Sequence, residues 1–235
     1  MTTREGLVGG NFAVNAIGFI PPTIAGLKIW SLFGTAVGDN VNVAIGGPTF
    51  SNIGAGPSYS AGYGHFVSGS TAITTNLADT TALQPITVIA AMRIASGTGC
   101  MCGTYTNSGG NHGFVIELSS APQLHGFGTG MGSIMNLTPT SPVTSFALYA
   151  VTYGASGVAP KAYDLTAGTS ATGTAGTTYV PNTGVNLSIG SAPVTGTSGE
   201  DIAFFAMYEA FLSGAQLTSL VPAIRSTLAN RGITV

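Results

Sequence analysis

The chain has 235 residues, of which only 6% are charged, and its formal net charge is −2. Disordered proteins combine low hydrophobicity with high net charge, so a hydrophobic content of 44% indicates a folded chain, long enough to bury a core without disulfides or metals. The six scattered basic residues form no cluster that would bind nucleic acid or an anionic membrane surface. A surface with so few charges is weakly protected against association, so we expect partners to cover part of it.

Residues 1–25 show little regular pattern, and we predict an N-terminal arm or edge strand followed by one domain at 26–235. The first residues do not resemble a secretory signal, because Glu5 stands where the positive region belongs. The apolar run at 12–33 is interrupted by two prolines and a lysine, which argues against insertion into a membrane.

Short apolar segments separated by glycine-rich turns follow, a pattern typical of strands in a sandwich or jelly roll. The segments predicted as strands are 26–33, 42–45, 57–63, 64–67 with 72–74, 85–95, 113–118, 123–130, 145–153, 159–165, 185–190 and 202–209. A polar turn is predicted at 76–81, and the stretch of Thr, Gly and Ala at 166–181 is predicted as a loop or an exposed edge.

The segment 85–95 is the clearest strand. Its side chains alternate between two faces. One face is fully apolar, and the other is half apolar and ends at Arg93. This pattern suits an inner strand of a sandwich. Helices do not alternate with the strands, so a parallel α/β fold is excluded. The fold prediction is all-β, a two-sheet antiparallel sandwich or jelly roll with a short C-terminal helical segment.

Cys100 and Cys102 are separated by one residue, so a strand would place both on one face, and a disulfide across so short a loop would be strained. We predict free thiols at a strand end, in a protein made in a reducing cytoplasm. A metal pair is the alternative, although no further Cys or His stands at zinc spacing.

The C-terminal segment has the pattern of an amphipathic helix. Ser213 and Gln216 fit a capping box, and Gly232 stands where a left-handed residue ends a helix. Pro222 predicts a kink or a break into two short helices. One apolar stripe, which we expect to cover the sandwich, consists of Leu217, Leu220, Val221, Ile224 and Leu228.

The order of these C-terminal elements carries a family resemblance. The strand VNLSIGSAP, a loop, and GEDIAFFAMYEAFLSGAQL leading into the helix resemble the C-terminal end of concanavalin A-like sandwiches of the laminin-G-like type. Upstream, YGHFVSGSTAITT and QPITVIAAMRI are similar to that family's early strand pair, so the resemblance covers about 26–235. It implies two antiparallel sheets. Such domains, with this charge-poor composition rich in Gly and Thr, also resemble virion surface proteins of tailed bacteriophages.

Acids and histidines offer no clear catalytic pattern. Glycoside hydrolases with this sandwich resemble one another in two acids on one face of a strand, whereas Glu200 and Asp201 are adjacent and point to opposite faces. His65, His112 and His125 have no neighbouring acid and no metal-ligand spacing. We therefore predict that the protein is not an enzyme.

Two sets of side chains are candidate binding groups. Calcium prefers hard oxygen ligands, and lectin-like members of the sandwich group use loop Asp and Asn, although Asx-rich turns are common without metal. Aromatic side chains in loops can stack on sugars or contact a partner, with packing under their own loops as the alternative. The metal candidates are Asp39, Asn40 and Asn42, and the glycan or partner candidates are Tyr59, Tyr63, Tyr105 and Tyr179.

The functional prediction is a non-enzymatic structural protein of a tailed-bacteriophage virion, either a capsid decoration or part of a fibre. Its expected partners are copies of itself, as a homotrimer, and other virion proteins such as the capsid shell; its expected location is the virion. The alternative is a carbohydrate-binding module that recognises a host surface glycan, and a glycan hydrolase ranks third. We expect no cofactor, with calcium as the alternative.

Overall fold

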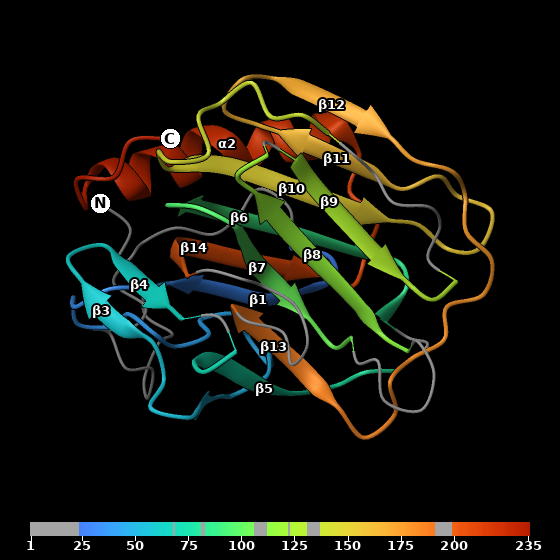
Figure 1. Ribbon diagram of the computed structural model, residues 1–235, viewed down its shortest axis with the longest axis horizontal. Helices are drawn as coiled ribbons and strands as arrows, with labels where there is room; N and C mark the ends of the chain where they lie inside the picture. The colour runs from blue at the N-terminus through green and yellow to red at the C-terminus, as the bar shows by residue number, and fades with distance from the viewer. Residues whose placement is uncertain are drawn as a thin grey trace, which may run out of the picture.

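The computed structural model describes residues 24–67, 69–80, 83–105, 112–121, 123–130, 137–190 and 199–235. Within these ranges the strands form two antiparallel sheets that lie face to face, with a helix at the C-terminal end (Figure 1). The predicted all-β sandwich is therefore confirmed. The predicted arm at 1–25 lies almost entirely outside the described residues.

The larger sheet has eight strands, and β14 pairs with three of them, β1, β4 and β6. The order is β12-β11-β10-β6-β14-β4-β3, and β1 pairs with β14 beside β4. Its strands are β1 (Leu27–Leu32), β3 (Ser58–Ser60), β4 (Tyr63–Phe66), β6 (Ile86–Ile94), β10 (Ala147–Tyr153), β11 (Lys161–Asp164), β12 (Thr169–Thr172) and β14 (Glu200–Tyr208). The exposed edge expected within 166–181 is β12.

The smaller sheet has six strands in the order β2-β5-β13-β7-β8-β9. They are β2 (Phe50–Ile53), β5 (Ala72–Ala78), β7 (Thr98–Gly103), β8 (Phe114–Ser119), β9 (Gln123–Gly128) and β13 (Asn186–Gly190). The predicted polar turn at 76–81 is partly wrong, because β5 continues to Ala78, which pairs with Asn186.

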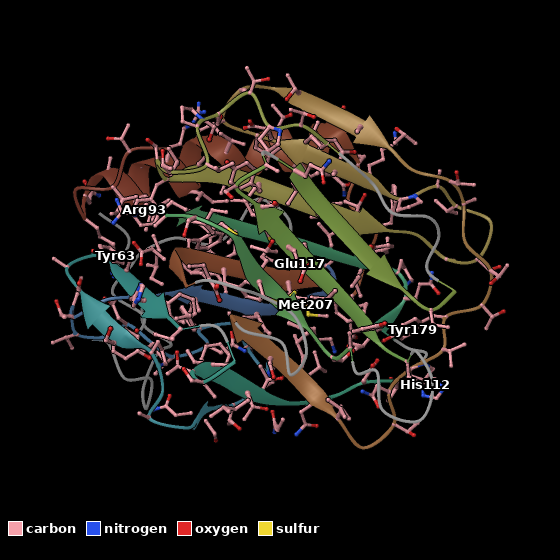
Figure 2. The ribbon with its side chains drawn as sticks, in the orientation of Figure 1. Tyr63, Arg93, His112, Glu117, Tyr179 and Met207 are labelled. Atoms are coloured by element: carbon pink, nitrogen blue, oxygen red, sulfur yellow. The ribbon has the colours of Figure 1, made fainter. Side chains whose placement is uncertain are left out.

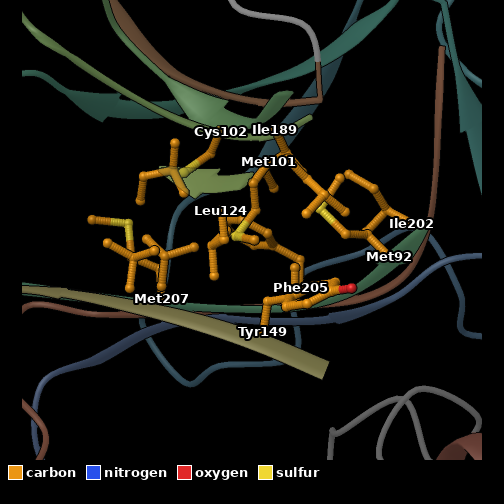
Figure 3. Packing of buried hydrophobic residues seen from close by; sticks show 14 of the residues in the cluster. Met92, Met101, Cys102, Leu124, Tyr149, Ile189, Ile202, Phe205 and Met207 are labelled. Atoms are coloured by element: carbon orange, nitrogen blue, oxygen red, sulfur yellow. The ribbon is translucent and has the colours of Figure 1, made fainter. Parts of the chain in front are cut away.

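The core lies between the sheets and follows the alternation of the strands. Met92 of β6 and Phe205 and Met207 of β14 face Met101 and Ile189 of the smaller sheet (Figure 3). All five side chains are buried. Burial of this apolar surface supplies the main force that holds the sheets together.

The outer face of the larger sheet is covered by α2 (Gly214–Ala229). Its apolar stripe packs on the outward side chains of β6 and β14, such as Ile89 and Phe204, in a second hydrophobic cluster. This contact explains why β6 is apolar on both faces. The helix begins with the predicted capping box of Ser213 and Gln216.

The predicted break at Pro222 is wrong, because α2 is continuous through it. Pro222 lies on the exposed side of the helix, and Thr218, whose carbonyl would accept the missing hydrogen bond, is exposed as well. Water can satisfy that carbonyl, while the buried stripe on the other side holds the helix on the sheet.

Two further local predictions were wrong. Residues 42–45 form no strand, since the side chain of Asn42 binds backbone groups of the surrounding loop, and β2 follows instead. A register shift between Cys100 and Cys102 turns Cys100 to the outer face and leaves Cys102 in the core. As predicted, neither cysteine forms a disulfide; both are buried, and burial raises the pKa of Cys102, so its thiol stays protonated.

Candidate functional site

A row of polar side chains crosses three neighbouring strands on the outer face of the larger sheet. His65 of β4 pairs in register with Asp201 of β14, which pairs with Arg93 of β6. Nδ1 of His65 lies 2.7 Å from Oδ1 of Asp201, and Nε of Arg93 donates to Oδ2 of the same carboxylate at 2.8 Å. One carboxylate therefore orients two cationic or ionisable groups.

Two aromatic rings enclose the guanidinium of Arg93. Its Cζ lies 5.1 Å from the ring centroid of Tyr63 and 4.6 Å from that of Phe146, and the two rings are 5.4 Å apart. Figure 2 shows Tyr63 and Arg93 at the same end of the molecule. We refer to Tyr63, His65, Arg93, Phe146 and Asp201 together as the Arg93 site.

The Arg93 site faces solvent. The side chain of His65 is 47% exposed and that of Arg93 35%, whereas that of Asp201 is more withdrawn. A carboxylate only accepts hydrogen bonds, so Nδ1 of His65 carries the hydrogen and Nε2 is left for a ligand. Aromatic rings beside fixed donors and acceptors suit a ligand with apolar and polar faces.

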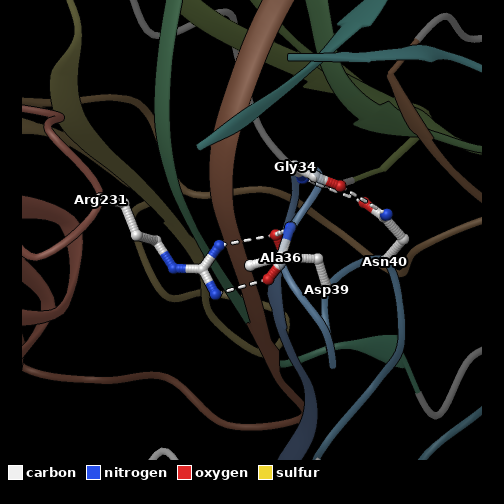
Figure 4. A network of polar contacts seen from close by, with 5 residues as sticks. All are labelled: Gly34, Ala36, Asp39, Asn40 and Arg231. Carbon is white, nitrogen blue, oxygen red and sulfur yellow. Dashed lines mark hydrogen bonds and ion pairs between the residues drawn. The ribbon is translucent and has the colours of Figure 1, made fainter. Parts of the chain in front are cut away.

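The loop after β1 holds the hairpin that carries Tyr63 and His65. Asp39 forms a two-pronged ion pair with Arg231, with Nη1 2.7 Å from Oδ2, and accepts a hydrogen bond from the amide of Ala36 (Figure 4). Gly62, at the tip of the β3–β4 hairpin, lies against the backbone of Arg231. A Cβ added at Gly62 would lie 3.0 Å from the carbonyl oxygen of Arg231. The ion pair thus fixes the C-terminal tail beneath the hairpin.

The metal candidates Asp39, Asn40 and Asn42 all serve this loop. Asn40, with φ +63, exchanges hydrogen bonds with the backbone of Gly34 (Figure 4). The Oδ1 of Asn42 accepts from two backbone amides, and its Nδ2 donates to the carbonyls of Lys28 and Pro48. Their side-chain oxygens are thus engaged by protein donors, and no group of three His, Cys, Asp or Glu suited to a metal occurs among the described residues.

The structure does not bring the four candidate tyrosines together. Tyr63 belongs to the Arg93 site, whereas Tyr59 packs on the opposite face of the hairpin against the core. Tyr105 packs beside Cys100 on the smaller sheet, and Figure 2 shows Tyr179 at the end of the molecule away from Tyr63. Tyr179 is 3% exposed, and its hydroxyl donates to the buried carboxylate of Asp79.

Glu200 lies on the other face of β14 from Asp201, as strand alternation predicts. It is 1% exposed and fits against Gly99, where an added Cβ would lie 2.8 Å from the Cβ of Glu200. Burial raises the pKa of Glu200 well above its ordinary value, the backbone of Cys100 opposes this shift, and the charges of Asp201 and Glu117 add to it.

Because the folded state raises the pKa of Glu200, its protonation favours folding at low pH. This contribution to the free energy of unfolding is fully present below the pKa of glutamate in the unfolded chain, about 4.3. It is lost as the pH rises through the pKa of Glu200 in the folded protein. Glu200→Gln is expected to raise the free energy of unfolding at pH 7 by about 1 kcal/mol and to flatten this pH dependence. Urea titrations at several pH values measure it.

Glu209→Gln is the matched control, because it removes the same charge from a surface ion pair with Lys28. The control is expected to leave the pH dependence that arises from Glu200 in place. If the free energy of unfolding of Glu200→Gln depends on pH as that of the wild type does, the raised pKa of Glu200 is not the source of this dependence.

Sequence reasoning missed most of the Arg93 site. No acid stands near His65 in the sequence. The acid that contacts it in the structure, Asp201, is 136 residues away along the chain. The available signal was Arg93 itself, a charge within an apolar inner strand where every other residue is buried. A cation at such a position indicates a paired or ligand-binding group.

No family model and no curated protein matches the chain. Trypanosoma rangeli sialidase in complex with sialic acid has a TM-score of 0.60 at 14% identity, over 92% of this chain and 35% of that chain. The binding domain of botulinum neurotoxin DC in complex with SialylT has a TM-score of 0.58 at 9% identity, over 86% of this chain and 52% of that chain. A structure of botulinum neurotoxin type C, described as depending on two ganglioside molecules for cell entry, has a TM-score of 0.57 at 11% identity. That match covers 83% of this chain and 51% of the toxin chain.

These similarities establish the fold. The chain spans about a third of the sialidase chain and about half of the toxin chains. None of the described helices is long and apolar enough to cross a membrane. The protein is similar to β-sandwich domains of the jelly-roll, concanavalin A-like type.

Proposed function

We propose that this protein is a carbohydrate-binding module and that the Arg93 site is its contact surface. The observation that carries the proposal is one partly exposed patch with two half-buried aromatic rings, Tyr63 and Phe146, around a fixed guanidinium. Sugars present apolar C–H faces that stack on such rings and hydroxyl groups that bind fixed donors and acceptors. Asp201 and His65 provide those polar groups beside the rings.

The solved structures with this fold support the proposal. The sialidase is bound to sialic acid, one toxin domain is bound to SialylT, and the other toxin is described as interacting with gangliosides. We propose binding without cleavage, because most glycoside hydrolases use two acids on one face, whereas Glu200 and Asp201 lie on opposite faces of β14.

Tyr63→Ala is expected to weaken glycan binding about tenfold, because the variant loses a stacking surface and one wall around Arg93. A glycan array identifies the ligand, and calorimetry with that ligand compares the variant with the wild type. Tyr105→Ala is the matched control, since Tyr105 is also half-buried but packs on the smaller sheet. Loss of binding in Tyr105→Ala but not in Tyr63→Ala contradicts the placement of the site.

We also retain the prediction that the module belongs to a tailed-bacteriophage virion, as a homotrimer on the capsid or in a fibre. The support for this setting is the charge content of 6%, which leaves a free surface weakly protected against association. A fibre tip can both assemble and bind glycan, so the two predictions are compatible. Sedimentation of a monomer at micromolar concentration counts against the assembly.

A further inference from the structure

The guanidinium of Arg93 is engaged on one side only. Its Nε donates to Asp201, whereas neither Nη1 nor Nη2 has an acceptor within the part of the chain that the structure describes. The side chain is 35% exposed, and neither Nη is among the buried polar atoms without a partner. The edge formed by Nη1 and Nη2 therefore faces solvent.

This edge is held in place before any ligand arrives. The rings of Tyr63 and Phe146 lie over the guanidinium, and the carboxylate of Asp201 prevents rotation about its long axis. Asp201 is itself held by His65. Because the group is already ordered, a ligand that binds it loses less entropy than it would on a mobile arginine.

We infer that the free edge of Arg93 binds a carboxylate, so that the ligand of the proposed glycan site is an acidic sugar, either a sialic acid or a uronic acid. This inference rests on the proposed function. Two N–H groups of one guanidinium match the two oxygens of a carboxylate in spacing and charge. A neutral sugar offers hydroxyl oxygens without charge, which satisfy the same pair of donors less well.

Selectivity comes from this short-range contact and not from a general attraction of anions. The charge of Arg93 is balanced by Asp201, and Glu200 lies on the opposite face of the strand. The chain as a whole has a net charge of −2. A change that keeps the positive charge but removes the planar fork is therefore expected to remove most of the selectivity.

Calorimetry on the full chain with two acidic ligands tests the inference: a sialylated trisaccharide and a uronic acid oligosaccharide, each compared with its carboxyl-reduced form. At least one acidic ligand is expected to bind about tenfold or more tightly than its reduced form, and the arm that responds identifies the sugar class. Arg93→Met and Arg93→Lys are expected to lose this ratio. Lys161→Met, which removes a positive charge from β11, is expected to preserve it.

The outcomes separate the inference from the proposed function. Equal binding of acidic and reduced sugars overturns the inference and leaves a neutral-glycan module. An acid preference that survives in Arg93→Met overturns the assignment to Arg93, provided that circular dichroism shows a folded variant. Binding of no sugar in any arm or on an array overturns both. The comparison of acidic with reduced sugars needs no variant, so it decides the inference even if Arg93→Met does not fold.

Discussion

Asp79→Ala is expected to lower the free energy of unfolding by about 3–5 kcal/mol. The carboxylate is 1% exposed and accepts hydrogen bonds from the hydroxyls of Tyr179 and Thr104 and from the amide of Asn182. Burial, together with the negative charge of Asp79, raises the pKa of Tyr179, so the phenol stays a donor. Alanine would remove the acceptor shared by two buried hydroxyl groups and a half-buried backbone amide.

Urea unfolding of wild type and variant measures this loss. Tyr179→Phe is the matched control, because it removes one of the three donors and leaves the carboxylate bound to the other two; a loss of about 1 kcal/mol is expected. A loss below 1 kcal/mol in Asp79→Ala contradicts the importance of this cluster. Glycan binding is expected to persist in both folded variants, since Tyr179 lies far from Tyr63 (Figure 2).

Asp39→Ala is expected to lower the free energy of unfolding by about 3 kcal/mol. The side chain of Asp39 is fully buried and that of Arg231 is 16% exposed, and removal of one partner leaves the other charge unpaired. The double variant Asp39→Ala/Arg231→Ala is expected to lose less than the sum of the single variants, which is the sign of a direct interaction.

The same measurement tests calcium. With the ion pair as the main role of Asp39, the melting temperature of the wild type is expected to be the same in EDTA and in millimolar calcium. A calcium-dependent rise that disappears in Asp39→Ala establishes instead that Asp39, Asn40 and Asn42 form a metal site, because a bound ligand stabilises only the state that binds it.

Only part of the candidate site could be predicted from sequence. The aromatic ring of Tyr63 marks it as a candidate in the sequence, although it lies in a strand and not in a loop. Strand alternation places Arg93 on the correct face but indicates no role for it. His65, Phe146 and Asp201 were missed as site residues, because their proximity to Arg93 depends on strand pairing across the sheet and not on local spacing.

The fold was predictable because its signals are local. Alternation in 86–94 identified an inner strand, since a strand buried on both faces is apolar on both. The capping box at Ser213 and the stripe that includes Leu220 identified α2, since capping and helical periodicity depend on neighbours within four residues. The effect of Pro222 depended instead on which side of the helix faces solvent.

The sequence by itself determined the two-sheet sandwich and its covering helix, because alternation and capping act over a few residues. Only the tertiary structure decided which face of β14 carries Asp201. Strict alternation back from Phe204, which faces outward, would turn Asp201 into the core and Glu200 outward. A register shift between Ile202 and Phe204 reverses both, since one extra residue exchanges the two faces of a strand. That shift places Asp201 beside His65 and Arg93, and it leaves Glu200 buried.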